Sequence, residues 1–369
     1  MHYPNNFKKL ISNSMKKIFF SSCVLLITLV LQPVLAQKSP KNVVFLIGDG
    51  MGIAQVYAGM VANNNSLELE RCTYSGFSKT YSSNNFTTDS GAGGTALACG
   101  VKTKNGMIGM GPDSVAVQSI LELSSKNKLA TGIVVACAVT HATPASYIAH
   151  QVNRDMYEEI ATDYLKTDID VFIGGGRKYF EDRSDGRNLS DELKAKNYKI
   201  AYTLDDVKSV KQGKLAGLLY DDQNPNMPAR GTMLPEATMA ALNILKNNNK
   251  GFFLMVEGSQ IDWAGHDNNS VQIVKEMLDF DQTIGRVLDF AKKDGNTLVI
   301  ITADHETGGL TLLNGKFGSD QLKAVFTTKN HSGVPVPVFA FGPGAENFTG
   351  FMENISFKKK IQNLLKLKN

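Results

Sequence analysis

Cysteine is scarce in this chain of 369 residues, which contains four, and tryptophan occurs once. So few cysteines exclude a small scaffold held together by disulfides. Three cysteines remain after residue 36, and nothing in the spacing of Cys72 and Cys99 supports the one bridge that they could form. Cys137 lies in the apolar run GIVVACAV, which favours a buried, inert thiol over a metal ligand or a bridge.

The sequence also lacks an excess of charge of either sign outside its first 36 residues. It has 39 basic and 35 acidic residues, and the surplus of four equals Lys8, Lys9, Lys16 and Lys17. Without residues 1–36 the chain is formally neutral, with 35 charged residues of each sign. The charge balance therefore does not indicate nucleic acid or acidic lipid as a partner.

Long apolar runs are absent as well, with one exception near the start. Four lysines and then the run IFFSSCVLLITLVLQPVLA precede a polar stretch, which is typical of a secretory signal peptide, here cleaved after Ala36. Met15 is an alternative start, because MKKIFF by itself opens a normal signal. An uncleaved membrane anchor is the alternative interpretation, but the run is barely long enough to span a bilayer and has Pro33 near its end. We expect a periplasmic or secreted protein without a membrane attachment after cleavage.

The rest of the composition is that of a folded protein. Hydrophobic residues make up 43% of the chain and charged residues 20%, with 33 glycines and 11 prolines, which excludes disorder and collagen-like repeats. Residues 184–232 are more polar than their surroundings, and we interpret them as a surface excursion within one domain. We therefore expect residues 37–369 to form a single domain.

Short apolar runs rich in Val, Ile and Phe alternate with helical patterns. Each run is too short for a buried helix and too continuously apolar for a sheet with one face in water, which indicates buried parallel strands. Helices are predicted over 235–247, over 270–293 and at the Lys-rich C-terminus. The alternation predicts an α/β fold with a doubly wound, mostly parallel central sheet flanked by helices. Its strands are expected at 42–47, 132–139, 170–173, 251–256, 297–302 and 336–341.

Carboxylate or imidazole side chains follow four of these six runs. In open α/β sheets ligands bind beyond the carboxyl ends of the strands, so these side chains are expected to meet at one edge. Each one alone is more often part of a surface turn or a helix face, and it is their coincidence that indicates a site. The residues are Asp49 after the first run, His141 and Thr143 after the second, Glu257, Asp262, Trp263 and His266 after the fourth, Asp304 and His305 after the fifth, and His331 before the last. Of the five histidines after residue 36, only His150 lies elsewhere.

Four carboxylates at one edge of a sheet need a counterion. Asp49, Glu257, Asp262 and Asp304 would repel one another, and without a cation their desolvation would cost several kcal/mol per ion or force them to protonate. Histidine mixed with carboxylate is typical of zinc sites, and an all-oxygen subset suits magnesium. The sequence therefore predicts a multinuclear metal centre.

A separate signal is the stretch TTDSGAGGTALA, in which Ser90 precedes small residues that indicate a helix. A serine at a helix N-terminus lies among backbone N–H donors at the positive end of the helix dipole, which suits a phosphorylated or metal-bound alkoxide. By itself the stretch would be interpreted as an ordinary N-cap in a glycine-rich loop. The three glycines at 174–176 lack the Lys-Ser/Thr of a phosphate-binding P-loop and are interpreted as a turn.

Six motifs, taken in order, resemble the alkaline phosphatase family. They are DGMG, TDSGAGGTA, THATPA, VEGSQIDWAGH, TADHETGG and a late His-Ser-Gly. The resemblance extends from Asn42 to the C-terminus, so that residues 37–369 would be one alkaline phosphatase catalytic domain. It implies the family's helix-flanked sheet, two Zn²⁺ ions and one Mg²⁺ ion, phosphomonoesterase activity and a homodimer.

The family's site residues carry over position by position. Ser90 resembles the nucleophile that becomes phosphoserine, and Arg154, in HQVNRD, resembles the arginine that holds two phosphate oxygens. The remaining matches imply the metal ligands. They are Asp262, His266 and His331 for the zinc that activates water, Asp49, Asp304 and His305 for the zinc that holds the serine alkoxide, and Asp49, Thr143 and Glu257 for magnesium.

Two positions depart from one well-known branch of the family, which has Asp in place of His141 and Lys in place of Trp263. Those two side chains normally interact, so their joint replacement resembles a coupled variant of other branches. With His141 and Trp263 at these positions, the resemblance does not fix how strongly magnesium binds or whether a second side chain contacts the phosphate. We expect His141 to lie behind the magnesium ligands instead of being one of them.

Three other activities are the alternatives. A phosphodiesterase of the same superfamily is the nearest, but Arg154 and the third metal site favour monoesters, whose terminal phosphate carries two charges. A sulfatase is disfavoured because Ser90 lacks the Cys/Ser-x-Pro-x-Arg context. An exported phosphate-binding protein would need the anion site but no nucleophile. We therefore predict a hydrolase of small phosphate monoesters with no nucleic-acid specificity.

Overall fold

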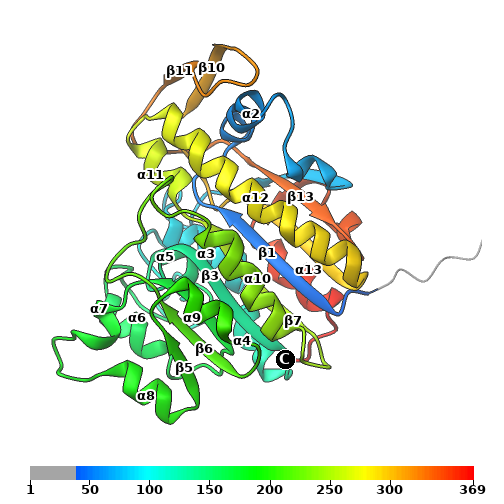
Figure 1. The fold of residues 1–369 in the computed structure, drawn as a ribbon. Helices are drawn as coiled ribbons and strands as arrows, with labels where there is room; N and C mark the ends of the chain where they lie inside the picture. Colours follow the sequence, from blue (N-terminus) through cyan, green and yellow to red (C-terminus); the bar gives the residue numbers. More distant parts are fainter. Residues whose placement is uncertain (1–38) are drawn as a thin grey trace, which may run out of the picture. The chain divides into compact units, whose positions relative to one another are not determined.

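Ten strands form one central sheet in the order β14-β2-β13-β8-β1-β7-β3-β4-β6-β5 (Figure 1). This architecture comes from a computed structural model, which describes residues 39–369. Neighbouring strands run parallel, except that β13 is antiparallel to both β2 and β8. The predicted α/β fold with a mostly parallel, helix-flanked sheet is therefore confirmed.

All six strands predicted from apolar runs are present. They are β1 (Asn42–Gly48), β3 (Ala130–Ala138), β4 (Val171–Gly175), β7 (Phe252–Gly258), β8 (Thr297–Thr302) and β13 (Val336–Phe341). The cause of their continuous apolar pattern is plain in β1. Val43, Phe45 and Ile47 pack into the core on one face of the sheet, whereas Val44 and Leu46 pack into the core on the other.

Helices cover both faces of the sheet. The core around Val44 is closed by three helices, α2 (Ile53–Ala62), α10 (Met233–Leu245) and α12 (Ser270–Asp294), of which α12 contacts both of the others. The core around Phe45 includes side chains from α3 (Ser90–Cys99), α4 (Ile120–Lys126) and α13 (Ser356–Leu364). The predicted helices at 235–247, at 270–293 and at the C-terminus are thus α10, α12 and α13.

The longest of these helices, α12, has clear start and stop signals. The side chain of Asn269 caps its N-terminus by accepting a hydrogen bond from the backbone N–H of Gln272. Gly295 ends it in the left-handed conformation, with φ of 66°, which a residue with a Cβ adopts less readily. In Figure 1 this helix (yellow) lies beside α10 on the same side of the sheet.

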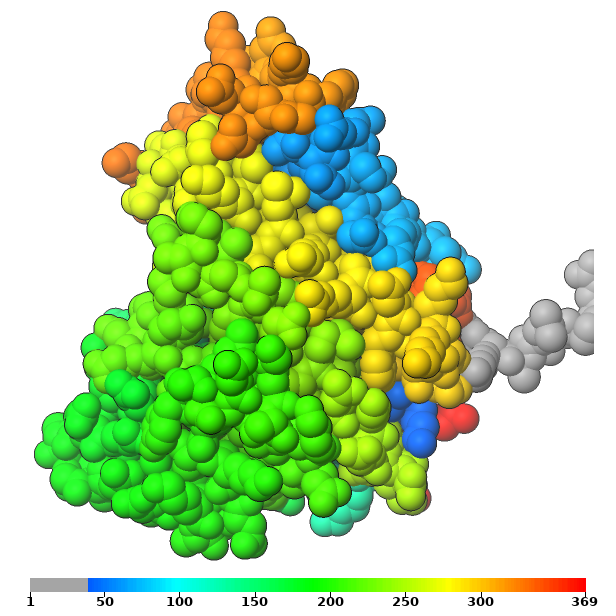
Figure 2. Space-filling view, viewed as in Figure 1, coloured from blue at the N-terminus to red at the C-terminus, as the bar shows by residue number. Residues whose placement is uncertain are grey.

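The polar stretch 184–232 belongs partly to the sheet. It contributes β5 (Tyr198–Ala201) and β6 (Lys214–Leu218), which extend the sheet beyond β4, together with α8 (Leu189–Ala195) and α9 (Leu204–Ser209). The interpretation as a surface excursion is therefore wrong for these two strands. β5 is a short edge strand and is only partly buried, so it lacks the continuous apolar pattern of the central strands. Figure 2 shows the green chain around this stretch on the visible surface.

The remaining elements are short. β2 (Tyr74–Lys79) and β14 (Gly350–Glu353) form the opposite end of the sheet. Two small antiparallel pairs lie outside it, β9 (Glu306–Thr307) with β12 (His331–Ser332) and β10 (Leu310–Gly315) with β11 (Leu322–Phe326). The other helices are α5 (Ala142–Ala145), α6 (Tyr157–Asp163), α7 (Lys178–Glu181), α11 (Gln260–His266), η1 (Glu68–Arg71) and η2 (Ala345–Phe348).

Two predictions concern the ends of the chain and its cysteines. The signal peptide predicted for residues 1–36 lies outside the described residues. Between residues 39 and 369, no helix combines the length and the apolar character needed to cross a membrane. Cys72, Cys99 and Cys137 are free in this part of the chain, so the Cys72–Cys99 disulfide that the sequence left open is not formed.

Candidate metal centre

The carboxyl ends of neighbouring parallel strands bring the predicted ligands together. Asp49 follows β1 and Asp304 follows β8, while Glu257 is itself part of β7. Glu257 is in register with Ile47 of β1 on one side and with Val135 of β3 on the other. The backbone N–H of Asp49 donates to the carbonyl of Gly258 at 3.2 Å, so Asp49 continues this pairing past the end of β1. The sheet register therefore fixes the carboxylates next to one another.

The first group of candidate ligands is Asp49, Asp304 and His305, one ligand atom from each lying within 4.8 Å of the others. All three side chains are fully buried. His305 Nε2 is 3.2 Å from Asp304 Oδ2 and 3.5 Å from Asp49 Oδ1. The same nitrogen is 3.2 Å from the hydroxyl oxygen of Ser90. The predicted nucleophile thus lies directly against the predicted ligands of its zinc ion.

The second group is Asp262, His266 and His331, which also converge within 4.8 Å. Asp262 and His266 are four residues apart on α11, so they share one face of that helix. His331 arrives from β12, whose pairing with β9 places it near the end of β8. Both histidine Nε2 atoms are 3.4 Å from Asp262 Oδ1 and 3.2 Å from each other.

The hydrogen bonds of the Nδ1 atoms of His266 and His331 indicate that a cation binds between their Nε2 atoms and Asp262. His266 Nδ1 contacts the carbonyl of Lys329 at 2.5 Å, and His331 Nδ1 contacts the carbonyl of Thr88 at 2.8 Å. A carbonyl oxygen only accepts hydrogen bonds, so each Nδ1 carries a proton. In neutral imidazoles both Nε2 lone pairs then point at Asp262, and three acceptors converge without a donor. A metal ion satisfies all three, and such outer hydrogen bonds are typical of metal-binding histidines.

The third predicted set, Asp49, Thr143 and Glu257, is also assembled. Thr143 is the second residue of α5, and its hydroxyl donates to Asp49 Oδ2 at 3.2 Å. Glu257 is fully buried on the same side of the sheet as Cys137, whose thiol donates to Glu257 Oε2 at 3.4 Å. His141 joins Cys137 and Glu257 in a further group whose ligand atoms converge within 4.8 Å.

Electrostatics at the strand ends favours bound cations. Burial, reinforced by neighbouring carboxylates, raises the pKa of Asp49 well above its ordinary value. Burial likewise raises the pKa of Glu257 to about 7 and the pKa of Asp304 to about 6. Among residues 39–369, Asp49 Oδ1, Asp304 Oδ2 and Glu257 Oε1 are buried oxygens without a hydrogen-bond partner. Buried anionic oxygens of this kind are stabilised by a coordinated metal.

The second group behaves differently because its members pair with one another. Although burial opposes ionisation, hydrogen bonds with His266 and His331 hold the pKa of Asp262 well below its ordinary value. The hydrogen bond to Asp262 in turn raises the pKa of His266 to about 9. In the absence of metal, the histidines beside Asp262 therefore bind protons at the position where a divalent cation would bind. Protons and metal compete for this position.

Ser90 is the first residue of α3, and Asp89 is its N-cap. Asp89 Oδ1 accepts a hydrogen bond from the backbone N–H of Ala92 at 2.9 Å. The helix therefore begins in a fixed orientation, with Ser90 buried at its positive end. The interpretation of Ser90 as an ordinary N-cap is therefore wrong, because Asp89 is the capping residue. The hydroxyl of Ser90 instead contacts His305, which is compatible with the nucleophile prediction.

Arg154 is held beside the candidate nucleophile by Asp89 and His141. Its NH1 group donates to Asp89 Oδ2 at 3.1 Å, and its NH2 group lies 3.4 Å from His141 Nε2. Asp89 Oδ2 also accepts from the backbone N–H of Gly106 at 2.9 Å. Asp89 was missed as a positioning residue from the sequence, although it stands directly before Ser90 in the motif.

The two residues expected behind the ligands contact each other. The rings of His141 and Trp263 meet edge to face with centroids 5.9 Å apart. A further residue was missed: the hydroxyl of Thr307 donates to Asp262 and lies 3.2 Å from His305 Nδ1. His150 is engaged elsewhere, with Glu122 and the carbonyl of Gly109, as its separate place in the sequence indicated.

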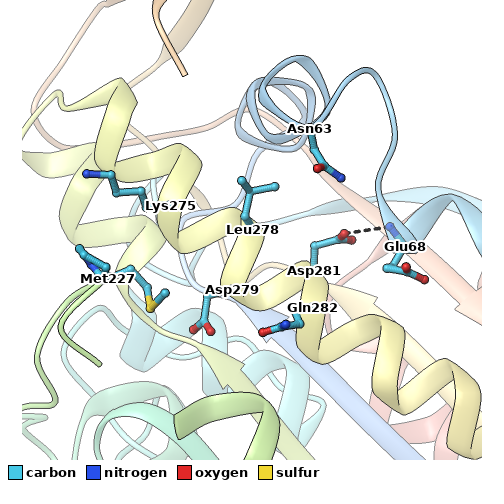
Figure 3. Close-up of a pocket in the computed structure, with 9 residues that line it drawn as sticks. Asn63, Glu68, Met227, Lys275, Leu278, Asp279, Asp281 and Gln282 are labelled. Carbon is cyan, nitrogen blue, oxygen red and sulfur yellow. Dashed lines mark hydrogen bonds between the residues drawn. The ribbon is translucent and has the colours of Figure 1, made fainter. Parts of the chain in front are cut away.

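A second group of buried charges joins Arg230, which precedes α10, to two carboxylates of α12. Arg230 donates to Glu276 and, at 2.8 Å, to Asp279 Oδ2, and the side chains of all three residues are almost completely buried. Asp279 lines a surface pocket of about 520 Å³, shown in Figure 3, together with Asp281 and Met227. This group was not predicted, because its members are far apart in the sequence and follow no strand.

Comparison with known proteins agrees with the motifs. The family model described as "Alkaline phosphatase" matches residues 40–325. Alkaline phosphatase 4 of Bacillus subtilis is 34% identical over 88% of this chain and 89% of its own length. The solved alkaline phosphatase of the Antarctic bacterium TAB5 is 42% identical, covers 90% of this chain and all of its own, and superposes with a TM-score of 0.85.

A variant of the TAB5 enzyme, in which one histidine is replaced by aspartate, was solved with Mg bound in a site called M3. It is 41% identical to this chain, covers 90% of it and 100% of its own length, and has a TM-score of 0.85. The similarity therefore includes a structure that contains a bound metal ion, and it covers 90% of this chain.

Proposed function

Because this chain belongs to the alkaline phosphatase family, whose members are hydrolases of phosphoric monoesters, we propose that it is an exported, metal-dependent phosphomonoesterase. In this proposal residues 37–369 act as one catalytic domain, and the reaction passes through a phosphoserine at a centre of two Zn²⁺ ions and one Mg²⁺ ion. The observation that carries the proposal is the position of the Ser90 hydroxyl, 3.2 Å from His305 and against a set of buried, convergent ligands.

The donor sets suit these metals. Asp262, His266 and His331 supply one carboxylate and two imidazoles, and Asp49, Asp304 and His305 supply two carboxylates and one imidazole, both of which are sets that bind zinc. Asp49, Thr143 and Glu257 offer oxygen alone, which suits magnesium. When bound, such cations stabilise negative charge on the attacking and leaving oxygens and lower the pKa of a coordinated water.

Ser90 is the proposed nucleophile. Its Oγ forms a bond to phosphorus as the ester P–O bond breaks, so that the alcohol leaves and Ser90 carries the phosphate. Water then breaks the Ser90 Oγ–P bond and releases inorganic phosphate. The first turn of α3 presents backbone N–H groups and the positive end of its dipole beside this oxygen, which stabilises the negative charge that develops there.

Arg154 is the proposed phosphate clamp. Its planar guanidinium matches two phosphate oxygens, and Asp89 fixes its orientation before the substrate binds. Three divalent cations and Arg154 together exceed the four carboxylates and a serine alkoxide by two positive charges. This surplus matches the dianion of a phosphate monoester and disfavours a diester, which carries a single negative charge.

Two further parts of the proposal concern location and assembly. The pattern of residues 1–36 supports export to the periplasm or the medium. A homodimer is supported by the exposed end of the sheet, where Phe77 of β2 stacks on Phe351 of β14 with ring centroids 5.2 Å apart. Phe351 is 70% exposed as a residue, and a second copy of the chain would cover such an apolar surface.

The test is a comparison of p-nitrophenyl phosphate with bis(p-nitrophenyl) phosphate under alkaline conditions in metal-replete protein. The proposal predicts a higher kcat/KM for the monoester, loss of turnover with a chelator and its return with zinc. Radiolabelled phosphate should be incorporated into the parent protein but not into Ser90→Ala. Zinc- and magnesium-replete protein without monoesterase turnover, or with a preference for the diester, would overturn the proposal.

A further inference from the structure

Cys137 is buried, as the sequence predicted, and it lies beside the candidate metal centre. It is on β3, two residues beyond Val135, which is in register with Glu257 of β7. Side chains two residues apart in a strand share a face, and both Val135 and Cys137 belong to the same core cluster. The thiol accordingly reaches Glu257 Oε2 at 3.4 Å. The contact with Glu257 was not predicted, because the apolar run around Cys137 does not show where β3 ends.

Cys137, His141 and Glu257 form a donor set of their own. One ligand atom from each lies within 4.8 Å of the other two, and all three residues are buried, with 8% of His141 exposed and none of the other two. In the described part of the chain, His141 Nδ1 and Glu257 Oε1 are buried without any hydrogen-bond partner. Buried polar atoms are rarely left unpaired, so these two indicate a missing ligand at this position.

The chemistry of the set differs from that of the expected magnesium site beside it. Magnesium prefers oxygen ligands in octahedral geometry, as Asp49, Thr143 and Glu257 can supply. Sulfur and imidazole nitrogen with one carboxylate instead match zinc and other softer divalent ions, which accept four ligands in a tetrahedron. Glu257 is common to both sets, so a single carboxylate faces two different kinds of site.

We propose that Cys137, His141 and Glu257 form a zinc-selective position that shares Glu257 with the expected magnesium site, so that zinc and magnesium exclude each other there. The thiol proton of Cys137 is released to solvent as the sulfur–metal bond forms. The inference rests on the proposed metal centre, but not on its catalytic role. It makes the metal in the third position depend on the zinc-to-magnesium ratio around the protein.

Cobalt gives a direct readout, because a Co²⁺–thiolate bond adds a charge-transfer absorption in the near ultraviolet that oxygen and nitrogen ligands do not. The full mature chain would be freed of metal and titrated with Co²⁺ alone. The other two ligand groups contain no cysteine, so the thiolate absorption should develop only when the third position fills. Added Mg²⁺ should suppress this absorption, because both ions need Glu257.

The variants Cys137→Ser and Cys99→Ser form a matched pair, since both remove a buried thiol but only the first lies in the cluster. Cys137→Ser should abolish the absorption and weaken binding of the third zinc equivalent by at least about 10-fold, the lower end of what losing even an outer partner of a metal ligand causes. Cys99→Ser should behave as the parent, and circular dichroism should show that both variants are folded.

The outcomes separate this inference from the proposed function. If the first two equivalents bind and restore phosphatase turnover but no thiolate absorption appears, the zinc-selective position is wrong and the proposed function stands. The same conclusion follows if the absorption persists in Cys137→Ser. If metal binds with the thiolate signature but no turnover appears in zinc- and magnesium-replete protein, the proposed function fails while this position remains.

Discussion

Two groups of buried charges in this molecule solve the same electrostatic problem in different ways. On α12, Glu276 and Asp279 are neutralised in part by Arg230, a cation that the chain itself provides. At the carboxyl ends of the strands, Asp49, Glu257 and Asp304 are equally buried but leave oxygens without partners. The first group also leaves Asp279 Oδ1 and Arg230 Nε without hydrogen-bond partners, but both of its carboxylates pair with an arginine once the chain folds. Within residues 39–369, no lysine or arginine forms an ion pair with the carboxylates of the second group, so their charge is balanced only when cations bind.

The difference shows what each group does. A buried ion pair with its own partners holds elements together, here the 225–230 segment and α12, and needs nothing from outside. Unpartnered carboxylates destabilise the metal-free fold, and a protein retains such groups where a ligand supplies the missing charge. We therefore expect substitutions at the strand ends to alter activity with little loss of stability, and substitutions in the Arg230 group to do the reverse.

The largest effect is expected for Ser90→Ala. Removal of a nucleophile lowers kcat by about 10³-fold or more. Because the serine hydroxyl is a partner of His305 but Asp89 caps the helix, both the metal content and the thermal midpoint should stay close to those of the parent. Kinetics with p-nitrophenyl phosphate, metal analysis and thermal unfolding would be measured on one preparation. Retention of turnover, or loss of both bound metal and stability, would contradict the expectation that strand-end residues serve activity and not stability.

Arg230→Met should give the opposite result. Removing Arg230 leaves Glu276 and Asp279 as buried charges without a cation, which destabilises a protein by about 3–5 kcal/mol. Turnover per folded molecule should be unchanged, because Arg230 contacts none of the candidate ligands. Urea unfolding measures the first expectation and steady-state kinetics the second.

Two controls accompany that variant. Arg286→Met removes a partly exposed arginine that pairs with Glu236, and its expected loss is about 1 kcal/mol or less. If Arg230→Met does not fold, a variant that also replaces Glu276 and Asp279 with leucine tests the same claim, since an apolar replacement of the whole group should fold. A loss no larger than that of Arg286→Met would show that the buried group does not stabilise the fold.

Asp281, beside the Arg230 group, gives a pH-dependent test (Figure 3). It accepts backbone hydrogen bonds from Glu68 and Leu69 at 2.8 and 3.0 Å, yet burial raises its pKa from 3.8 to about 6. A raised carboxyl pKa contributes stability that is complete below pH 3.8 and is lost as the pH rises through about 6.

The asparagine side chain of the Asp281→Asn variant does not titrate, so the variant should not show this loss of stability with rising pH. Relative to the parent, its free energy of unfolding should therefore rise by roughly 2 kcal/mol between about pH 4 and about pH 7. Groups elsewhere titrate equally in both proteins and cancel in the difference. Urea unfolding across this range measures it, and a difference independent of pH would show that Asp281 is not destabilised by its burial.

The smallest effect is expected for Asp304→Asn in metal-free protein. Asparagine keeps the oxygen that accepts from the backbone N–H groups of Gly50 and His305, but removes one of the buried like charges. The metal-free variant should be as stable as the parent or more stable by about 1 kcal/mol, whereas the metal-loaded variant should bind zinc less tightly. Thermal unfolding with and without metal measures both, and a destabilised metal-free variant would contradict the contrast.

Much of the fold followed from the sequence because of one physical rule. Strands covered on both faces are continuously apolar, so β1, β3, β7 and β8 stand out, and parallel strands place the residues after them at one edge. The edge strand β5 is only partly buried and lacks this pattern, and it was missed together with its short neighbour β6. The strongest site predictions therefore concern residues that follow central strands.

The remaining parts of the candidate site depend on contacts that no local pattern encodes. Cys137 and Thr307 contact the ligands only through the register of β3 with β7 and through the short β9–β12 pair. The Arg230 group joins a loop to α12 across 46 and 49 residues of sequence. The spacing of apolar residues indicates which face of a helix or strand is buried, but it does not indicate which buried polar groups contact one another.

The most direct test of the central claim is a stoichiometric metal titration of metal-free protein, with p-nitrophenyl phosphate turnover and bound metal followed in the same sample. We expect no turnover without metal, turnover that appears as zinc binds, and saturation once the two zinc groups and the third position are filled. Full turnover in metal-free protein would contradict it, as would an inactive protein in which every position is filled.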